Sequence, residues 1–307
     1  MVTVGAVEAG GTKFVCALAR VDPADPSRLP VLLAEESVPT GLPGPTLEKV
    51  RRFFEAAGTA SGEIEAFGIG CFGPIDPVPG SPSWGRILAT PKKGWIGTDV
   101  AGFFQGSFGK PVAFDTDVNA AALGERLWGA ARGVDSFVYL TVGTGIGGGA
   151  FVEGRLLHGS SHPEMGHIRL SRAPGDAFEG ACPFHGTCFE GLASGPAIEK
   201  RWGRKGTELE PEHPAWELEA SYLAQGVASL CLALSPELFI LGGGVGGRPD
   251  LLRRTRELLP AALGGYRRDV NTTAEASRLL VGPGLGTRSG IMGAAGLAAR
   301  SNGAAFP

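Results

Sequence analysis

Two cysteines and two histidines are spaced as ligands of a metal ion. Cys182, His185 and Cys188 follow one another at intervals of three residues, and His167 precedes Cys182 by fifteen. Structural zinc sites use thiolate sulfur and imidazole nitrogen, and four protein ligands complete a tetrahedral shell. The spacing therefore predicts a structural Zn²⁺ that fastens the loop near residue 160 to the loop near residue 185. The alternatives are four unrelated reduced side chains, or a nucleic-acid zinc finger, which the neutral-to-acidic surroundings disfavour.

Two glycine-rich turns are candidates for binding phosphate. They are Gly10-Gly11-Thr12-Lys13 and Gly143-Thr144-Gly145, and each lies between apolar segments typical of strands. Glycine allows bare backbone amides to approach phosphate oxygens, and the threonine hydroxyls and the lysine add further donors. A plain hairpin turn is the alternative for either turn alone. Residues 143–148 also spell G-x-G-x-x-G, but a strand-like segment follows where a dinucleotide-binding motif needs a helix.

Two carboxylates stand at the junction of a short strand and a helix. Asp115 and Asp117 are two apart, so on an extended segment their side chains point the same way, and either can accept a proton from a hydroxyl group. For Asp117 a helix N-cap is the alternative role.

The elements that position these residues alternate between strands and helices. Each half of the chain begins with a glycine-rich hairpin, which predicts an α/β protein of two similar lobes with a cleft between them. The expected strands cover 2–18 (interrupted by the first turn), 64–74, 112–114, 137–142, 150–152 and 238–241, and the expected helices cover 45–57, 120–128, 215–234 and 290–299.

Composition excludes several classes of protein. The chain has 307 residues, of which 43% are hydrophobic and 19% charged, as expected for about two globular domains. A net charge of −3 with scattered basic residues disfavours nucleic acid and anionic membranes as partners. Apolar runs are too short to cross a membrane, and the N-terminus has no leader pattern, so a cytoplasmic protein is expected. The 50 glycines lack a collagen period and indicate many tight turns or close approaches.

Six motifs together resemble the ROK family of sugar kinases and repressors, in the order in which that family carries them. These are Glu8-Ala9-Gly10-Gly11-Thr12-Lys13, Gly68-x-Gly70-x-x-Gly73-Pro74, Asp117-Val118-Asn119-Ala120-Ala121-Ala122-Leu123-Gly124-Glu125, Gly143-Thr144-Gly145-Ile146-Gly147, Glu164-Met165-Gly166-His167 and Leu241-Gly242-Gly243-Gly244-Val245. The segments Thr90-Pro91-Lys92-x-Gly94-Trp95 and Ser161-His162-Pro163-Glu164 are similar to the bacterial fructokinase branch.

The resemblance implies a two-lobed actin-like ATPase (ribonuclease H-like) fold, with ATP and Mg²⁺ in a central cleft and phosphoryl transfer to a hexose. It makes Asp117 the general base. It assigns sugar contacts to Glu164, His167, Glu190 and Asn119, and nucleotide contacts to Gly10, Gly11, Thr12, Lys13, Thr144, Gly145, Pro236, Gly242, Gly243 and Gly244. His167 is also one of the expected metal ligands.

The resemblance predicts D-fructose as the sugar and fructose 6-phosphate as the product, with glucose or mannose phosphorylation, or a non-catalytic sugar sensor, as the alternatives. It implies a homodimer with no nucleic-acid partner, because only seven residues precede Glu8 where family repressors carry a winged helix. The expected lobes are 1–118, completed by a C-terminal helix at 288–307, and 119–287 with the zinc-binding loop at 160–190. Glu8 and Thr116 stand where many relatives have Asp and Asn.

Overall fold

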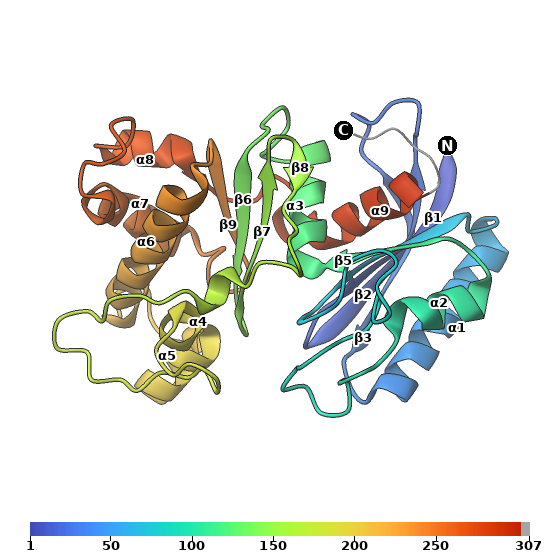
Figure 1. The fold of residues 1–307 in the computed structure, drawn as a ribbon, viewed down its shortest axis with the longest axis horizontal. Helices are drawn as coiled ribbons and strands as arrows, with labels where there is room; N and C mark the ends of the chain where they lie inside the picture. The colour runs from blue at the N-terminus through green and yellow to red at the C-terminus, as the bar shows by residue number, and fades with distance from the viewer. Residues whose placement is uncertain (302–307) are drawn as a thin grey trace. The chain divides into compact units, whose positions relative to one another are not determined.

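The structure, a computed structural model, describes residues 1–301 (Figure 1). Contacts between residues divide the chain into two compact units. Unit 1 comprises Met1–Gly133, Leu156–Pro163 and the described residues from 288 onward, and unit 2 comprises Val134–Arg155 and Glu164–Thr287. The last six residues of the C-terminal helix expected at 288–307 lie outside the described residues.

Unit 1 is built on a mixed five-stranded sheet with the order β3-β2-β1-β4-β5. β1, β2 and β3 are antiparallel neighbours, whereas β4 and β5 run parallel to β1. The strands are β1 (Val2–Ala9), β2 (Lys13–Val21), β3 (Val31–Pro39), β4 (Ala66–Cys71) and β5 (Val112–Thr116). β1 and β2 are joined by the first glycine-rich turn, and every residue of β4 is buried.

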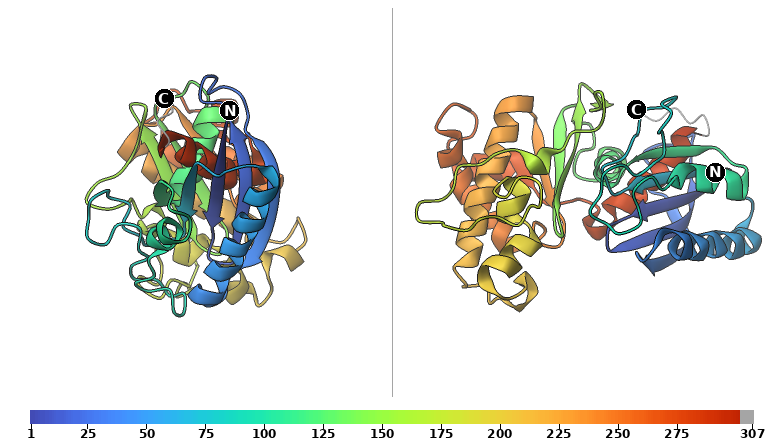
Figure 2. Two further views of the ribbon diagram at one scale, coloured as in Figure 1. Left: turned by 90° about the vertical axis from the view of Figure 1, so that its right-hand side faces the viewer. Right: turned by 60° about the horizontal axis from the view of Figure 1, so that its bottom comes forward.

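Helices cover both faces of this sheet (Figure 1). α1 (Pro43–Ser61) and α2 (Val100–Phe108) pack on one face, where the rings of Phe54, Phe67 and Phe104 meet at centroid distances of 5.1 to 6.1 Å. α3 (Asp117–Trp128) and α9 (Ser289–Ser301) lie on the other face, as the left view of Figure 2 also shows for α9. A Cβ at Gly68 of β4 would lie 1.9 Å from the carbonyl oxygen of Ala294, so glycine lets α9 lie directly on the sheet.

α3 and α9 touch through backbone atoms. A Cβ at Gly293 would lie 1.6 Å from the carbonyl oxygen of Ala120, and one at Gly124 would lie 2.5 Å from that of Ser289. This close packing places the whole of α3 in unit 1. The observed division, between Gly133 and Val134, therefore differs from the sequence-based division after residue 118.

Unit 2 contains a second five-stranded sheet with the order β10-β9-β6-β7-β8. β6 pairs with β7 in antiparallel fashion and with β9 in parallel. The strands are β6 (Phe137–Val142), β7 (Ile146–Val152), β8 (Arg155–Leu156), β9 (Leu238–Gly242) and β10 (Leu280–Val281), of which the last residue of β8 belongs to unit 1.

The helices α6, α7 and α8 stand on one side of this second sheet (Figures 1 and 2). The helices of unit 2 are α4 (Phe189–Ala193), α5 (Gly195–Trp202), α6 (Ala215–Leu234), α7 (Pro249–Leu263) and α8 (Thr273–Leu279), with 3₁₀ turns at Met165–His167 (η1) and Gly206–Glu208 (η2), and Gly286–Arg288 (η3) ends at the junction with unit 1.

The helices expected from the sequence are present, and all of them except α6 have shifted ends. α6 begins and ends where predicted, whereas α3 begins three residues earlier, at Asp117. α1 begins two residues earlier than predicted, at Pro43, and the Thr46 hydroxyl accepts a hydrogen bond from the Gly41 amide at 3.0 Å.

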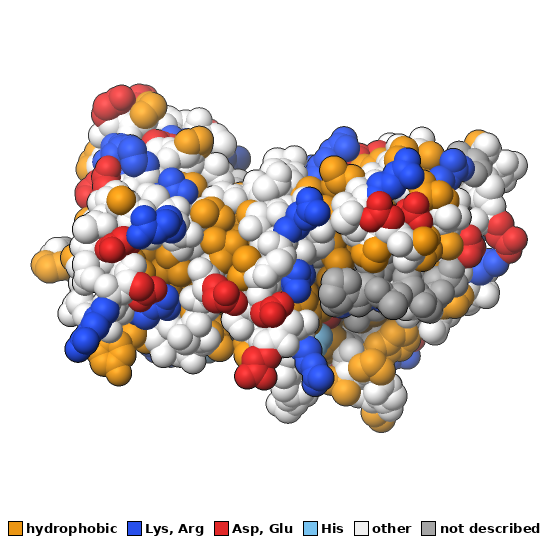
Figure 3. Space-filling view, turned by 90° about the horizontal axis from the view of Figure 1, so that it is seen from above, with side chains coloured by type: hydrophobic (Ala, Val, Ile, Leu, Met, Phe, Trp, Pro, Cys, Tyr) orange, Lys and Arg blue, Asp and Glu red, His pale blue; other side chains and the backbone are white. Residues whose placement is uncertain are grey.

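Acidic and basic side chains are interspersed on the face shown in Figure 3. Within residues 1–301, no helix has the length and apolar character needed to cross a membrane.

Candidate active site

The first glycine-rich turn is held by two segments of unit 1. The Gly10 amide donates to the Lys13 carbonyl at 3.0 Å, which closes the turn between β1 and β2. The Thr40 hydroxyl donates to the Gly10 carbonyl at 2.8 Å, and Lys92 Nζ donates to the Gly11 carbonyl at 2.6 Å. Gly11, Thr12 and Lys13 are exposed. The turn thus presents an ammonium, a hydroxyl and backbone groups to solvent, as a phosphate-binding turn requires.

Carboxylates stand near the carboxyl ends of β1 and β5, the two strands that flank β4 in unit 1. Glu8 of β1 and Asp115 of β5 are both in register with Gly70 of β4, which lies between them. A Cβ at Gly70 would lie 3.3 Å from the Cα of Asp117, so glycine admits the start of α3 over the strand ends. Ligands of open α/β sheets bind at this edge.

Glu8 lies against the first turn of α9. A Cβ at Gly290 would lie 2.4 Å from the Glu8 carboxyl carbon, and the backbone of Ile291 hydrogen-bonds to the carboxylate. Burial raises the pKa of Glu8, and the Lys13 ammonium partly offsets this effect.

Asp117 is the first residue of α3, and its neighbour Thr116 is the N-cap. The Thr116 hydroxyl accepts a hydrogen bond from the Asn119 amide at 3.0 Å, which is the capping bond considered as the alternative role of Asp117. The Asp117 carboxylate accepts from the Val118 amide at 2.9 Å and is half-buried. A carboxylate in the first turn of a helix is stabilised in its ionised form by the helix dipole.

Asp115 and Asn119 form a buried network with His158. Asp115 is 5% exposed, and its Oδ1 accepts from the Thr116 amide at 2.7 Å and from Asn119 Nδ2 at 2.8 Å. Its Oδ2 lies 2.9 Å from His158 Nε2, and this hydrogen bond raises the pKa of His158. Asn119 is 1% exposed, and its sugar contact, expected from the resemblance, stays a prediction.

The second glycine-rich turn lies beside the turn that follows β9. The Gly143 amide donates to the Gly145 carbonyl at 2.9 Å, and the Val245 and Gly246 amides donate to the Val142 carbonyl at 2.9 and 3.1 Å. The structure thereby brings the predicted nucleotide residues Thr144, Gly145, Gly242, Gly243 and Gly244 together in unit 2.

Pro236 lies apart from the other predicted nucleotide contacts. It precedes β9, whereas Gly242 to Gly244 stand at the other end of this five-residue strand. A strand rises about 3.3 Å per residue, which separates Pro236 from the glycine turn. Pro236 is buried, and its carbonyl accepts a hydrogen bond from Arg267.

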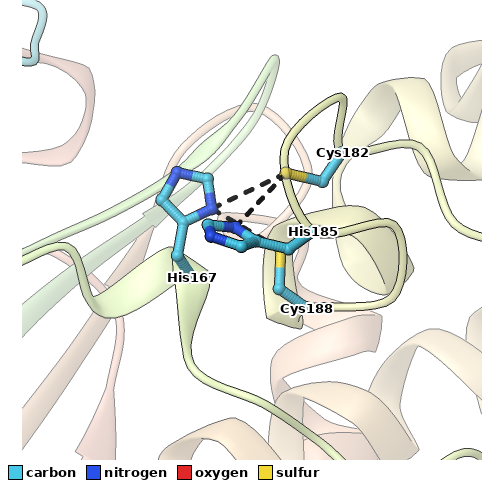
Figure 4. Close-up of side chains that lie close together, drawn as sticks. All are labelled: His167, Cys182, His185 and Cys188. Carbon is cyan, nitrogen blue, oxygen red and sulfur yellow. Dashed lines mark hydrogen bonds between the residues drawn. The ribbon is translucent and has the colours of Figure 1, made fainter.

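The four predicted metal ligands meet in unit 2 (Figure 4). His167 Nδ1 lies 3.8 Å from Cys182 Sγ and 3.5 Å from Cys188 Sγ, and His185 Nδ1 lies 3.8 Å from Cys182 Sγ. A tetrahedral zinc ion, at about 2.3 Å from sulfur and 2.0 Å from nitrogen, would hold such atoms about 3.5 Å apart. The donor set and its spacing therefore fit zinc. Burial raises the pKa of Cys188 to about 11, so a thiolate at neutral pH requires a cation beside it.

η1 rests directly on β7 because two glycines leave room for it. A Cβ at Gly166 would lie 1.9 Å from the Ile146 carbonyl oxygen, and one at Gly148 would lie 2.5 Å from the Met165 sulfur. His167 Nε2 lies 3.9 Å from the Glu164 carboxylate, while Nδ1 of the same ring faces the cysteines. A metal ion held by these four residues would fix the segment that presents Glu164.

Glu190 contacts the second glycine-rich turn. Its Oε2 accepts a hydrogen bond from the Ile146 amide at 3.0 Å, and a Cβ at Gly145 would lie 2.6 Å from that oxygen. The structure therefore places this predicted sugar contact against the predicted phosphate-binding turn.

Sequence reasoning left four residues of this site without a role. Besides His158, they are His162, whose Nε2 accepts from the Ile75 amide at 3.1 Å, and the turn-binding residues Thr40 and Lys92. The available signal was the clustering of two of the five histidines just before Glu164. The partners of these histidines, Asp115 for His158 and Ile75 for His162, are distant in sequence, so the sequence did not reveal the hydrogen bonds.

The arrangement suits transfer of a phosphoryl group. Phosphoryl transfer needs positioned amides and charge neutralisation at the phosphates, and a base near the attacking hydroxyl. Unit 1 by itself offers a turn bearing Lys13 and the Asp117 carboxylate, and unit 2 by itself offers the second turn and the segment bearing Glu164.

Comparisons with known proteins agree with this chemistry. The model of the ROK family matches residues 4–301. A fructokinase of Zymomonas mobilis is 45% identical over 302 residues, covering 96% of this chain and 95% of its own length. A ROK hexokinase of Thermus thermophilus is 30% identical with a TM-score of 0.73, and the match covers 96% of this chain and 97% of that one. A ROK glucokinase of Streptomyces griseus, solved with glucose and AMPPNP, is 26% identical with a TM-score of 0.73 over 97% of this chain and 99% of that one.

Proposed function

Because the chain belongs to the ROK family, we propose that it is an ATP-dependent hexose kinase that converts D-fructose to fructose 6-phosphate. The observation that carries this proposal is the Asp117 carboxylate at the strand ends of unit 1, the edge of the sheet at which the turn bearing Lys13 also begins. Relatives named as fructokinases at 39 to 45% identity favour fructose among the hexoses. The predicted α/β, actin-like ATPase fold is confirmed by the likeness to solved ROK kinases.

Asp117 is the proposed general base. Its carboxylate takes the proton of the attacking sugar hydroxyl while the amides and cations of the glycine turns stabilise the phosphates of ATP. The buried network of Asp115, Asn119 and His158 fixes the start of α3 and with it the position of Asp117.

Mg²⁺ fits the carboxylate edge of unit 1, because hard cations bind oxygen ligands. Glu8 and Asp117 are the residues proposed to hold it, directly or through water. When bound, the ion would neutralise charge on the phosphates of ATP.

Zinc is proposed as a structural ion held by His167, Cys182, His185 and Cys188. All four ligands come from the protein, which leaves no open position for chemistry at the metal. Its role is then to hold the 3₁₀ turn η1, which follows Glu164, against the loop that leads into α4, which carries Glu190.

The substitution Asp117→Asn tests the assignment. Asn has nearly the same shape but accepts no proton, so turnover should fall by about 10² to 10⁴-fold while affinity for an ATP analogue stays nearly unchanged. Asp25→Asn, the same change at an exposed position, is the control. Full activity in the Asp117 variant would remove Asp117 from the mechanism.

A panel of hexoses in a coupled ATP assay tests the substrate. Sugars that differ at one hydroxyl are separated by a few hydrogen bonds, so kcat/KM should be highest for fructose and lower for glucose and mannose. A higher value for glucose or mannose would reassign the substrate, and no ATP consumption with any sugar would favour a sugar sensor.

On the resemblance alone we also propose a cytoplasmic homodimer, for which light scattering should give twice the chain mass of 31.6 kDa.

A further inference from the structure

Glu190 occupies a position between two parts of unit 2. It lies in α4, two residues after the predicted metal ligand Cys188, and the resemblance assigns it to the sugar. Its carboxylate nevertheless reaches β7, where Oε2 accepts the Ile146 amide hydrogen at 3.0 Å. That amide belongs to the first residue after the turn formed by residues 143–145.

The same segment also holds the other end of the turn. The Gly195 amide, at the start of α5, donates to the Gly143 carbonyl at 2.7 Å. Residues 190 to 195 therefore hold the turn at Gly143 and at Ile146, on either side of Thr144 and Gly145. The turn contains two glycines, Gly143 and Gly145, and glycine loses more conformational freedom on ordering than any other residue.

α4 is a firm support for these contacts. Phe189 is fully buried, and a Cβ at Gly226 of α6 would lie 2.4 Å from its ring. The Phe189 amide donates to the Ile168 carbonyl at 2.9 Å, next to the predicted metal ligand His167. Glu190 is therefore held from both sides, and its carboxylate has little freedom to leave the turn.

Gly145 is required by this contact. A Cβ there would lie 2.6 Å from Glu190 Oε2, well inside van der Waals contact. The glycine at this position thus admits the carboxylate as well as leaving the backbone open.

We propose that Glu190 is a positioning residue for the second glycine-rich turn, so that a side chain assigned to the sugar also sets the affinity for nucleotide. The inference rests on the proposed function, in which this turn receives the phosphates of ATP. Its physical basis is preorganisation: a turn held in its binding conformation before the ligand arrives gives up less entropy on binding.

Three substitutions separate the hydrogen bond from the charge. Glu190→Gln removes the charge but keeps an oxygen that can accept the Ile146 amide. Glu190→Asp keeps the charge, but its side chain is one methylene too short to reach. Glu190→Ala loses both the charge and the hydrogen bond. Glu164→Ala is the control, because Glu164 is also a predicted sugar contact but lies on a different segment, as the N-cap residue of η1.

Affinity for AMPPNP with Mg²⁺ is measured by calorimetry with no sugar present, and amide exchange of residues 143–146 is measured without any ligand. Zinc content is checked in each variant. We expect Glu190→Asp and Glu190→Ala to bind the nucleotide roughly five- to tenfold more weakly than wild type, and their turns to exchange faster. Glu190→Gln and Glu164→Ala should stay within about twofold of wild type.

Equal affinity and equal exchange in all four variants would overturn the proposal, as would a Gln variant as weak as the Ala variant. If the Ala variant does not fold, the comparison of Asp with Gln decides. A wild-type protein that fails to bind AMPPNP contradicts the proposed function instead, and the exchange measurement then still reports whether Glu190 holds the turn.

Discussion

The contact between α3 and α9 makes a sharp prediction about stability. Gly293 faces α3, and a Cβ there would lie 1.6 Å from the carbonyl oxygen of Ala120 and 3.0 Å from the Gly124 amide nitrogen. These are backbone atoms of a helix, which cannot rotate away as a side chain can. The substitution Gly293→Ala must therefore push the two helices apart.

The expected magnitude follows from two opposing effects. Overpacking a buried contact costs about 1 to 3 kcal/mol, and a rigid backbone oxygen places this site near the upper value. Replacing glycine by alanine inside a helix returns about 1 kcal/mol. We expect Gly293→Ala to lower the free energy of unfolding by about 2 kcal/mol.

Gly106 provides a matched control for the same substitution. It lies inside α2, it is exposed, and a Cβ there would meet no atom within 4 Å. Only the helix propensity changes, so Gly106→Ala should raise the free energy of unfolding by about 0.5 to 1 kcal/mol.

Urea denaturation followed by circular dichroism measures both variants against wild type. The two substitutions should differ by about 3 kcal/mol and have opposite signs. A Gly293 variant as stable as the Gly106 variant would refute the close helix contact, and with it the assignment of α3 to unit 1.

Two further predictions concern the histidines and the metal cluster. Because Asp115 raises the pKa of His158, the stability from this pair is complete below the unfolded pKa near 6.5 and is lost as pH rises through the higher folded value. The stability difference between wild type and His158→Gln should then shrink from about 1 kcal/mol or less, given the partial exposure of His158, toward zero as the pH rises through the folded pKa; a constant difference would contradict the pairing. The metal cluster should hold one zinc per chain, and Cys188→Ser should lose it together with stability and sugar affinity; emission spectrometry that finds no zinc, or a Ser variant with unchanged stability and sugar affinity, would count against the site.

The local motifs were visible in the sequence because each depends on neighbours along the chain. Glycine turns between apolar strands predicted both hairpins, since only glycine permits such close approaches. The spacing of Cys182, His185 and Cys188 brought three metal ligands together on one loop. The sequence also contains 50 glycines, and no local pattern explains most of them.

Tertiary structure decided how those motifs support one another. Gly293, Gly124 and Gly68 are glycines because helix and sheet backbones touch there, which no local pattern reveals. The hydrogen bond between Asp115 and His158 joins two residues that are 43 positions apart in the sequence, and the one between Glu190 and Ile146 joins two that are 44 positions apart. Such contacts depend on how strands and helices pack, so the sequence determined which groups the site contains, and only the folded chain determined which of them hold the others in place.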